Sequence, residues 1–128
     1  MLRIRLVNDL PPNGDPMPAY IDQPHRLNTT NFHFHGSHVS PSGIADNVMR
    51  SMEPSQSYDI EIAIPADHTA GTYWYHPHHH GGADVQMASG MAAAVIKGDF
   101  DQVPEIAAAR DRLLVLGEVV FVVTLAPR

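Results

Sequence analysis

Two pairs of histidines carry the clearest chemical signal in this sequence. His33 and His35 are separated by one residue, and so are His76 and His78. Side chains two residues apart in a β-strand project from the same face, so each pair presents its two imidazoles together. Imidazoles without a thiolate or a carboxylate cluster beside them suit copper, zinc or nickel better than calcium or magnesium, which prefer oxygen ligands. If the two strands are neighbours, this spacing predicts a transition-metal site.

The composition of the chain excludes several other classes of function. The 128 residues carry a formal net charge of −6 and contain no run of basic residues, which argues against a nucleic-acid partner. The sequence has no cysteine, which rules out disulfides, zinc fingers, iron–sulfur clusters and the thiolate of a blue-copper site within this chain. Seven of the nine histidines lie in two clusters, at residues 33–38 and 76–80. The histidines are therefore the functional signal.

Short segments that alternate with a period of two predict an all-β domain. Eleven prolines and nine glycines separate these segments, and a period of two is typical of strands with one buried face. We expect strands at residues 2–6 and 60–64, a loop at 11–18, a buried strand at 91–96, a short helix at 104–112, and one bent strand or two strands at 113–125. The apolar run at 113–125 is shorter than the roughly 20 residues of a membrane-spanning helix, so we expect no membrane span.

The histidine segments, residues 31–35 and 71–78, alternate aromatic residues with histidines. If both segments are strands, the aromatic residues that share one face are Phe32, Phe34, Tyr73 and Tyr75. The two histidine pairs then lie on the opposite face, together with Trp74. Pro77 lacks an amide donor, so its end of the second strand should lie at a sheet edge or beyond the ladder. The period of two thus predicts that the aromatic residues belong to the core and the histidines to the metal site.

Three segments together resemble a known family. They read TNFHFHGSH at residues 30–38, GIADNV at 43–48, and PADHTAGTYWYHPHHHG at 65–81. This combination resembles the first cupredoxin domain of bacterial laccase-type multicopper oxidases, and the likeness extends over residues 2–121. The resemblance implies an all-β, cupredoxin-like Greek-key β-sandwich or barrel with room for one short helix. It also implies a laccase-like oxidoreductase that is periplasmic or secreted.

The resemblance assigns copper as the cofactor and gives roles to individual histidines. In that family the first domain supplies one ligand to a type 2 copper and three ligands to a pair of type 3 coppers. By motif position, His33 would bind type 2 copper. The ligands of type 3 copper would be His35, His76 and His78. No ligand role is implied for the remaining histidines, which are His25, His38, His68, His79 and His80.

Asp46 has two competing interpretations. It lies where the family often has a carboxylate that relays protons to oxygen at the type 2 copper, a catalytic role that requires a group able to hold charge beside a cation. Alternatively, Asp46 is a turn-forming residue before Asn47, because Asp side chains bond to the backbone in turns. The sequence favours neither interpretation over the other.

The ligand count leads to three functional hypotheses. Four histidines cannot enclose three coppers, and this chain has no cysteine for a type 1 site. The first hypothesis is a copper-binding domain whose type 2/type 3 site is completed by self-association, with a trimer favoured over a dimer, and with dioxygen and phenolic or other small reductants as reaction partners. Without a type 1 site, oxidation by this domain alone should be weak. The other hypotheses are a copper-binding or storage module without turnover and an isolated domain fragment.

We expect residues 1–128 to form a single domain. Relative to the family, this domain is incomplete at its N-terminus, and the residues after 121 depart from the family pattern, so both ends suggest a fragment or a truncation. Residues 1–7 enter a strand-like pattern at once and do not read as a secretory signal. An exported form would therefore need a leader that is missing from this sequence.

Overall fold

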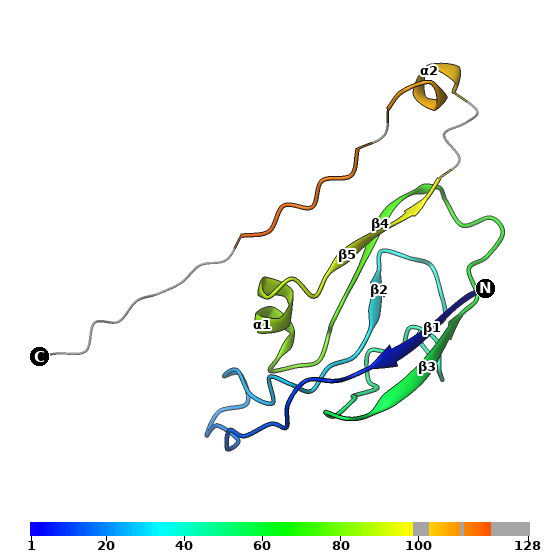
Figure 1. Ribbon diagram of the computed structural model, residues 1–128. Coiled ribbons are helices and arrows are strands. Elements are labelled where there is room, and N and C mark those ends of the chain that lie inside the picture. Colours follow the sequence, from blue (N-terminus) through cyan, green and yellow to red (C-terminus); the bar gives the residue numbers. More distant parts are fainter. Residues whose placement is uncertain (99–102, 111, 119–128) are drawn as a thin grey trace, which may run out of the picture.

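The computed structural model describes residues 1–98, 103–110 and 112–118. It consists of two small antiparallel sheets and two short helices (Figure 1). The elements in chain order are β1 (Leu2–Val7), β2 (His33–His35), β3 (Ser57–Ile62), β4 (Gly71–His76), α1 (Ala83–Ala88), β5 (Ala93–Lys97) and α2 (Pro104–Ala107). The all-β fold class is therefore confirmed, with one short helix more than expected.

The first sheet pairs β1 with β3 and confirms the alternation seen in the sequence. Ile4 lies opposite Ile60, and these residues point into the molecule because apolar residues occupy every second position on both strands. The intervening residues are exposed, and Arg5 lies opposite Asp59 at 3.1 Å. Since both charged groups are in water, this ion pair adds little stability, and burial of the apolar face holds the sheet in place.

The second sheet has the strand order β2-β4-β5 and carries both histidine segments. His33 lies opposite His76, and His35 lies opposite Trp74. Strand β4 ends at His76 because the next residue, Pro77, has no amide hydrogen to donate to a ladder. Of the two placements predicted for Pro77, a sheet edge or a position beyond the ladder, the structure shows the second.

The core lies between the two sheets, which Figure 1 shows facing each other. Its buried members come from both sheets and from the segment that leads into β2, and they are Phe32, Phe34, Ile60 and Ile62. Phe34 packs edge-to-face on Tyr73 with ring centroids 6.0 Å apart, while Phe32 stacks on Tyr75 at 5.5 Å. The aromatic half of the alternating pattern thus forms the core, and the histidine half is left on the opposite face of the sheet.

Helix α1 was not predicted, because the one buried side chain in it is the polar Gln86 instead of an apolar stripe. The Nε2 amide of Gln86 donates to the carbonyls of Leu27 and Thr29 at 2.7 and 2.8 Å, and its Oε1 accepts the hydroxyl of Thr30 at 2.8 Å. These three bonds satisfy a buried amide. They attach α1 to the segment that leads into β2.

Four sequence expectations need correction in their extent. The strand expected at 60–64 covers Ser57–Ile62. Strand β2 is shorter than residues 31–35, because the chain before His33 leaves the sheet and Thr30 pairs with Met52 in an isolated bridge. Strand β5 covers Ala93–Lys97 and is half-buried at the sheet edge, not fully buried, since it has a partner on one side alone among the described residues. Among the described residues, the helix expected at 104–112 forms over Pro104–Ala107.

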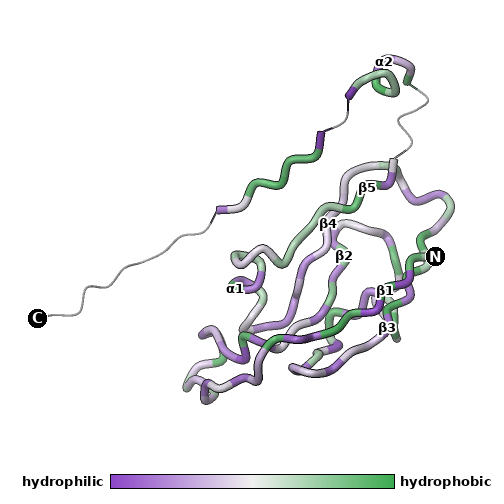
Figure 2. The backbone as a smooth tube through the Cα atoms, viewed as in Figure 1, coloured by the Kyte–Doolittle hydropathy of each residue, from purple (hydrophilic) through white to green (hydrophobic). Residues whose placement is uncertain are grey.

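The prediction of a strand at 113–125 is wrong for residues 113–118, which the structure describes. Residues 113–118 form no strand, and the side chains of Leu114 and Leu116 are 81% and 93% exposed. Figure 2 shows this segment as a hydrophobic stretch away from the sheets. High β-propensity yields a strand only where a partner supplies hydrogen bonds and burial, and no strand of the described residues pairs with it. Residues 119–125 lie outside the described residues.

No helix among the described residues is long and apolar enough to span a bilayer.

Gly81 allows a close contact that a side chain would prevent, so we predict that Gly81→Ala destabilises the protein more than Gly90→Ala. The two glycines have nearly equal φ angles, +94° and +93°. A Cβ at Gly81 would lie 2.6 Å from the His25 ring and 2.7 Å from its carbonyl oxygen, whereas a Cβ at Gly90 would meet nothing within 4 Å.

The left-handed backbone alone should cost each variant about 1–2 kcal/mol of unfolding free energy. The clash should cost Gly81→Ala a further 1–3 kcal/mol or so. Urea denaturation of both variants checks the difference. Equal losses of stability would contradict the contact described for His25.

Candidate metal centre

The structure brings three of the four predicted ligands together at one end of the second sheet. One ring nitrogen from each of His33, His35 and His76 lies within 4.8 Å of the other two. The ring centroids of all three pairs are 5.3 Å apart. This triangle follows from the register, because His76 lies directly across from His33, and His35 shares a face with His33. We call these three residues the histidine cluster.

The fourth predicted ligand, His78, lies beside the histidine cluster. Its ring centroid is 5.2 Å from that of His33 and 6.1 Å from that of His76. The backbone N–H of His78 donates to Oδ1 of Asn31 at 2.6 Å, and Nδ2 of Asn31 donates to the carbonyl of Val48 at 2.7 Å. Asn31 is buried. Its side chain therefore continues the pairing of the two segments where Pro77 has ended the ladder.

Sequence reasoning missed this positioning role of Asn31. The available signal was its place in the alternation, because Asn31 precedes His33 by two residues and so shares the histidine side of the pattern. A polar residue there that becomes buried must find hydrogen-bond partners. Only the fold reveals that His78 and Val48 are those partners.

Two acceptors outside the histidine cluster fix which ring nitrogen carries the proton. Nδ1–H of His76 donates to the carbonyl of Pro77 at 2.7 Å, and Nδ1–H of His33 donates to the carboxylate of Asp46 at 3.1 Å. In a neutral imidazole the other nitrogen then has a free lone pair. Nε2 of His76 lies 3.0 Å from Nδ1 of His35, so it accepts a hydrogen bond from that ring. Nε2 of His33 therefore has a free lone pair for a metal, and the lone pair of Nε2 of His76 becomes available when a metal replaces the hydrogen bond from His35.

Asp46 faces the histidine cluster and does not form the turn of the alternative interpretation. Its carboxylate is buried, and its Oδ1 also accepts the backbone N–H of Phe34 at 2.7 Å. The turn role belongs to the next residue, because Oδ1 of Asn47 accepts the N–H of Met49 at 3.1 Å. Asp46 thus binds the backbone of strand β2 and orients the ring of His33.

The environment of His76 favours its neutral form. Burial lowers the pKa of His76 below its ordinary value of 6.5; the carbonyl of Pro77 acts in the opposite direction, and the neighbouring imidazoles of His33, His35 and His78 lower the pKa further. A histidine must be neutral to bind a metal. The indole of Trp74 stacks on His76 with centroids 4.1 Å apart and remains 39% exposed. His76 is thus kept in the form that can act as a ligand.

The other histidines make separate contacts. His68 uses both ring nitrogens, because Nδ1–H donates to the carbonyl of Thr69 at 3.0 Å and Nε2 accepts the N–H of His38 at 3.1 Å. Nδ1–H of His25 donates to the carbonyl of Gln23 at 2.7 Å. His79 bonds to Ser51 through Nδ1 at 3.2 Å, while its buried Nε2 has no hydrogen-bond partner among the described residues.

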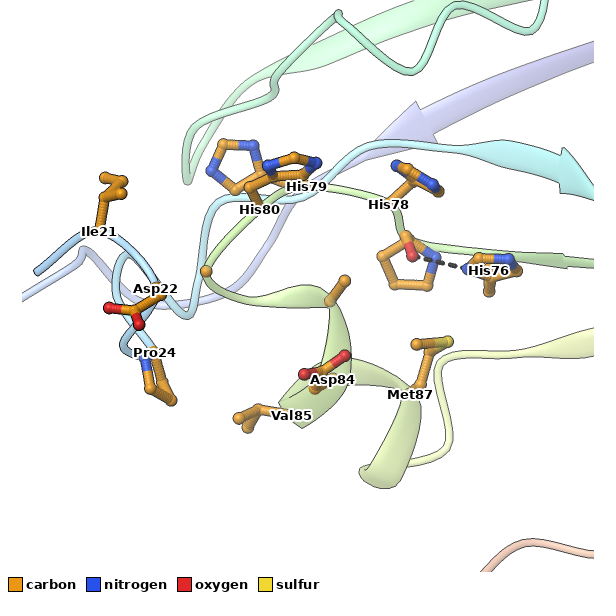
Figure 3. Close-up of a pocket in the computed structure, with 13 residues that line it drawn as sticks. Ile21, Asp22, Pro24, His76, His78, His79, His80, Asp84, Val85 and Met87 are labelled. Atoms are coloured by element: carbon orange, nitrogen blue, oxygen red, sulfur yellow. Dashed lines mark hydrogen bonds between the residues drawn. The ribbon is translucent and has the colours of Figure 1, made fainter.

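A cavity of about 410 Å³ adjoins the histidine cluster. Figure 3 shows His76 and His78 at one end of it and Asp22 at the other. Asp84 and Met87 of α1 line a further side. This volume falls within the range of small-molecule sites, so the cluster is reached through a formed cavity.

We predict that Asp46→Asn changes the tautomer of His33 and leaves that of His76 unchanged. The new amide keeps an oxygen for the N–H of Phe34, but it presents an N–H group to His33 in place of an acceptor. The His33 ring should change from the Nδ1–H tautomer to a mixture of tautomers in the metal-free protein at pH 8. Long-range ¹H–¹⁵N NMR of the imidazoles measures this, with His76 as the internal control. A pure Nδ1–H tautomer of His33 in the variant would contradict the role of Asp46.

Comparison with known proteins agrees with this geometry. The model of a multicopper oxidase family matches residues 24–99, which is more than half of the chain and includes both histidine pairs, Asp46 and α1. A search of curated proteins finds no significant match. The matched segment contains every residue of the histidine cluster, and its strands have the all-β, cupredoxin-like arrangement of the family. From its sequence and its histidine site alike, the chain belongs to the multicopper oxidase family.

Proposed function

We propose that this domain supplies type 2 and type 3 copper ligands to an oxygen-reducing copper site that other copies of the chain complete. In this proposal it corresponds to the first cupredoxin domain of a bacterial laccase-type enzyme. The observation that carries the proposal is the convergence of three imidazoles whose ligand atoms lie within 4.8 Å of one another. His33 is the proposed type 2 ligand, and His35, His76 and His78 are the proposed type 3 ligands.

The donor set fits copper. Among the divalent metals that bind imidazole, copper binds most tightly, and the histidine cluster consists of imidazoles alone. Ligating histidines normally donate their second N–H to a carboxylate or a carbonyl, and the partners of His33 and His76 are the carboxylate of Asp46 and the carbonyl of Pro77. When bound, copper supplies one-electron transfer; the protein residues supply ligand orientation.

Asp46 is the proposed proton-handling residue. Its buried Oδ2 already accepts the Nδ1 proton of His33, and its Oδ1 is held by the N–H of Phe34. A carboxylate fixed by two donors stays oriented toward the ring that it serves. In the proposal, Asp46 both holds the His33 ring in place and takes up or releases a proton during oxygen reduction.

Self-association follows from the number of ligands and from the exposed face of the second sheet. One chain offers four proposed histidine ligands where a complete cluster of three coppers needs more, and in this proposal other copies of the chain contribute the rest. Trp74 and Ile96 lie on the histidine face and are 39% and 46% exposed. Apolar side chains on an exposed sheet face favour association. We propose a homo-oligomer, with a trimer favoured over a dimer, in the periplasm or outside the cell.

The proposed reactants are dioxygen and small reductants such as phenols. The sequence has no cysteine, so the thiolate that carries electrons in a type 1 site cannot come from this chain. In this proposal, electrons come from reductants that reach the histidine site directly. We therefore propose that oxidation by this domain alone is slow compared with that of a complete laccase.

Replacement of both histidines of the second pair should remove most of the bound copper. His76→Ala/His78→Ala deletes two of the four proposed ligands and keeps the aromatic residues of the core. His38→Ala is the matched control, because it removes a histidine whose ring no hydrogen bond ties to the histidine cluster. Elemental analysis after copper loading and desalting gives the copper content per chain. Equal copper in the double variant and the unaltered chain would disprove the ligand assignment.

The copper-loaded protein should sediment as an oligomer, and Ile96→Glu should shift it toward the monomer. The new carboxylate would be buried without a partner in the proposed interface, which is costly. Val7→Glu is the control, because Val7 is similarly exposed, at 52%, but lies on the first sheet. Analytical ultracentrifugation measures the mass. A monomer with a full complement of copper would refute self-association.

A further inference from the structure

The cavity beside the histidine cluster contains metal-binding groups that the proposed ligand set does not use. His80 lines it from the loop after β4, and Asp84 and Met87 line it from α1 (Figure 3). These side chains offer an imidazole nitrogen, a carboxylate oxygen and a thioether sulfur. All three types of atom bind copper, and the thioether favours the cuprous ion.

The imidazoles form a series that leads from solvent to the histidine cluster. The ring of His80 is exposed and lies 6.2 Å from that of His78, which is half-buried. The ring of His78 lies 6.1 Å from that of His76, which is buried. With metal–nitrogen bonds of about 2.0 Å, rings at this spacing are close enough for an ion to gain the next ligand before it has lost the previous one.

The orientation of α1 explains why Asp84 and Met87 both line the cavity. Residues three apart on a helix share a face, and Gln86 fixes which face points inward through its bonds to Leu27, Thr29 and Thr30. A helix held by a buried amide on one side presents Asp84 and Met87 to the cavity on another. The polar Gln86, which was unexpected in a buried position, thus places both donors.

The charge of the cavity suits a cation. The charged side chains among its lining residues are Asp22 and Asp84, with no lysine or arginine. A cavity lined by charge of one sign raises the local concentration of ions of the opposite sign and speeds their association.

We infer that this cavity is the entry route for copper, in which His80, Asp84 and Met87 each offer a donor atom to an incoming cuprous ion and His78 passes the ion to the histidine cluster. This inference rests on the proposed copper-binding function. The transfer is an exchange of ligands without change of oxidation state, because each donor binds the ion as the previous donor releases it. His80, Asp84 and Met87 then determine the rate of copper loading, and the final copper content depends on the histidine cluster and His78.

Trp74 provides a direct readout of loading. It is the single tryptophan of the sequence, and it stacks on His76 with centroids 4.1 Å apart. Copper that reaches the histidine cluster should therefore quench its fluorescence. Metal-free protein is mixed with cuprous ion under anaerobic conditions in a stopped-flow instrument, and elemental analysis gives the copper content at the end. Circular dichroism checks that each variant is folded.

Two variants test the route, and two serve as controls. The rate of quenching should fall about tenfold in Asp84→Asn/Met87→Leu, which is the low end of the effect expected from a charged cavity. It should also fall in His80→Gln, which removes the exposed imidazole at the start of the series. The final copper content of both should equal that of the unaltered chain. His38→Gln, which changes a histidine away from the cavity, should load at the normal rate. So should Val85→Ala, which changes a cavity residue without a donor atom.

The outcomes separate this inference from the proposed function. Normal loading rates in both test variants would overturn the entry route and leave the copper site intact. A loss of final copper content in folded His80→Gln would also overturn it, because His80 would then belong to the resident site. Failure of the unaltered chain to bind copper would overturn the proposed function itself.

Discussion

The pairing of β2 with β4 is the constraint on which the rest of the site depends. It sets His33 opposite His76 and Phe34 opposite Tyr75. Because neighbouring residues of a strand face opposite ways, a slip of one residue would turn the histidines toward the core and the aromatic rings toward solvent. Burial of Phe32 and Phe34 against Ile60 and Ile62 opposes such a slip. The free energy gained by burying these core side chains therefore maintains the geometry of the histidine cluster.

Hydrogen bonds from buried polar side chains extend this geometry past the end of the strands. Asp46 and the carbonyl of Pro77 orient two rings of the histidine cluster, and Asn31 holds the backbone of His78. Each of these groups is buried and would be costly to leave unpaired. The cost of breaking them makes the positions of the proposed ligands specific.

The histidine face and the core face have opposite requirements, and one short sheet meets both. The core face needs complementary apolar packing, which the stacked Phe32 and Tyr75 provide at 5.5 Å. The histidine face needs imidazoles that are neutral and accessible, and the lowered pKa of His76 and the adjoining cavity provide these conditions. The exposed Trp74 lies on this face beside His76. An exposed aromatic residue beside the proposed ligands is the feature on which the proposed self-association rests.

The sequence by itself determined the strand alternation, the separation of Phe32 and Phe34 from His33 and His35, and the end of β4 at Pro77. These features depend on local period and on the missing amide of proline, which are encoded residue by residue. Tertiary structure decided the roles of Asn31, Asp46 and Gln86, because their partners lie 12 to 59 residues away in the chain. It also decided that residues 113–118 form no strand despite their composition. A strand needs a partner, and sequence periodicity cannot supply one.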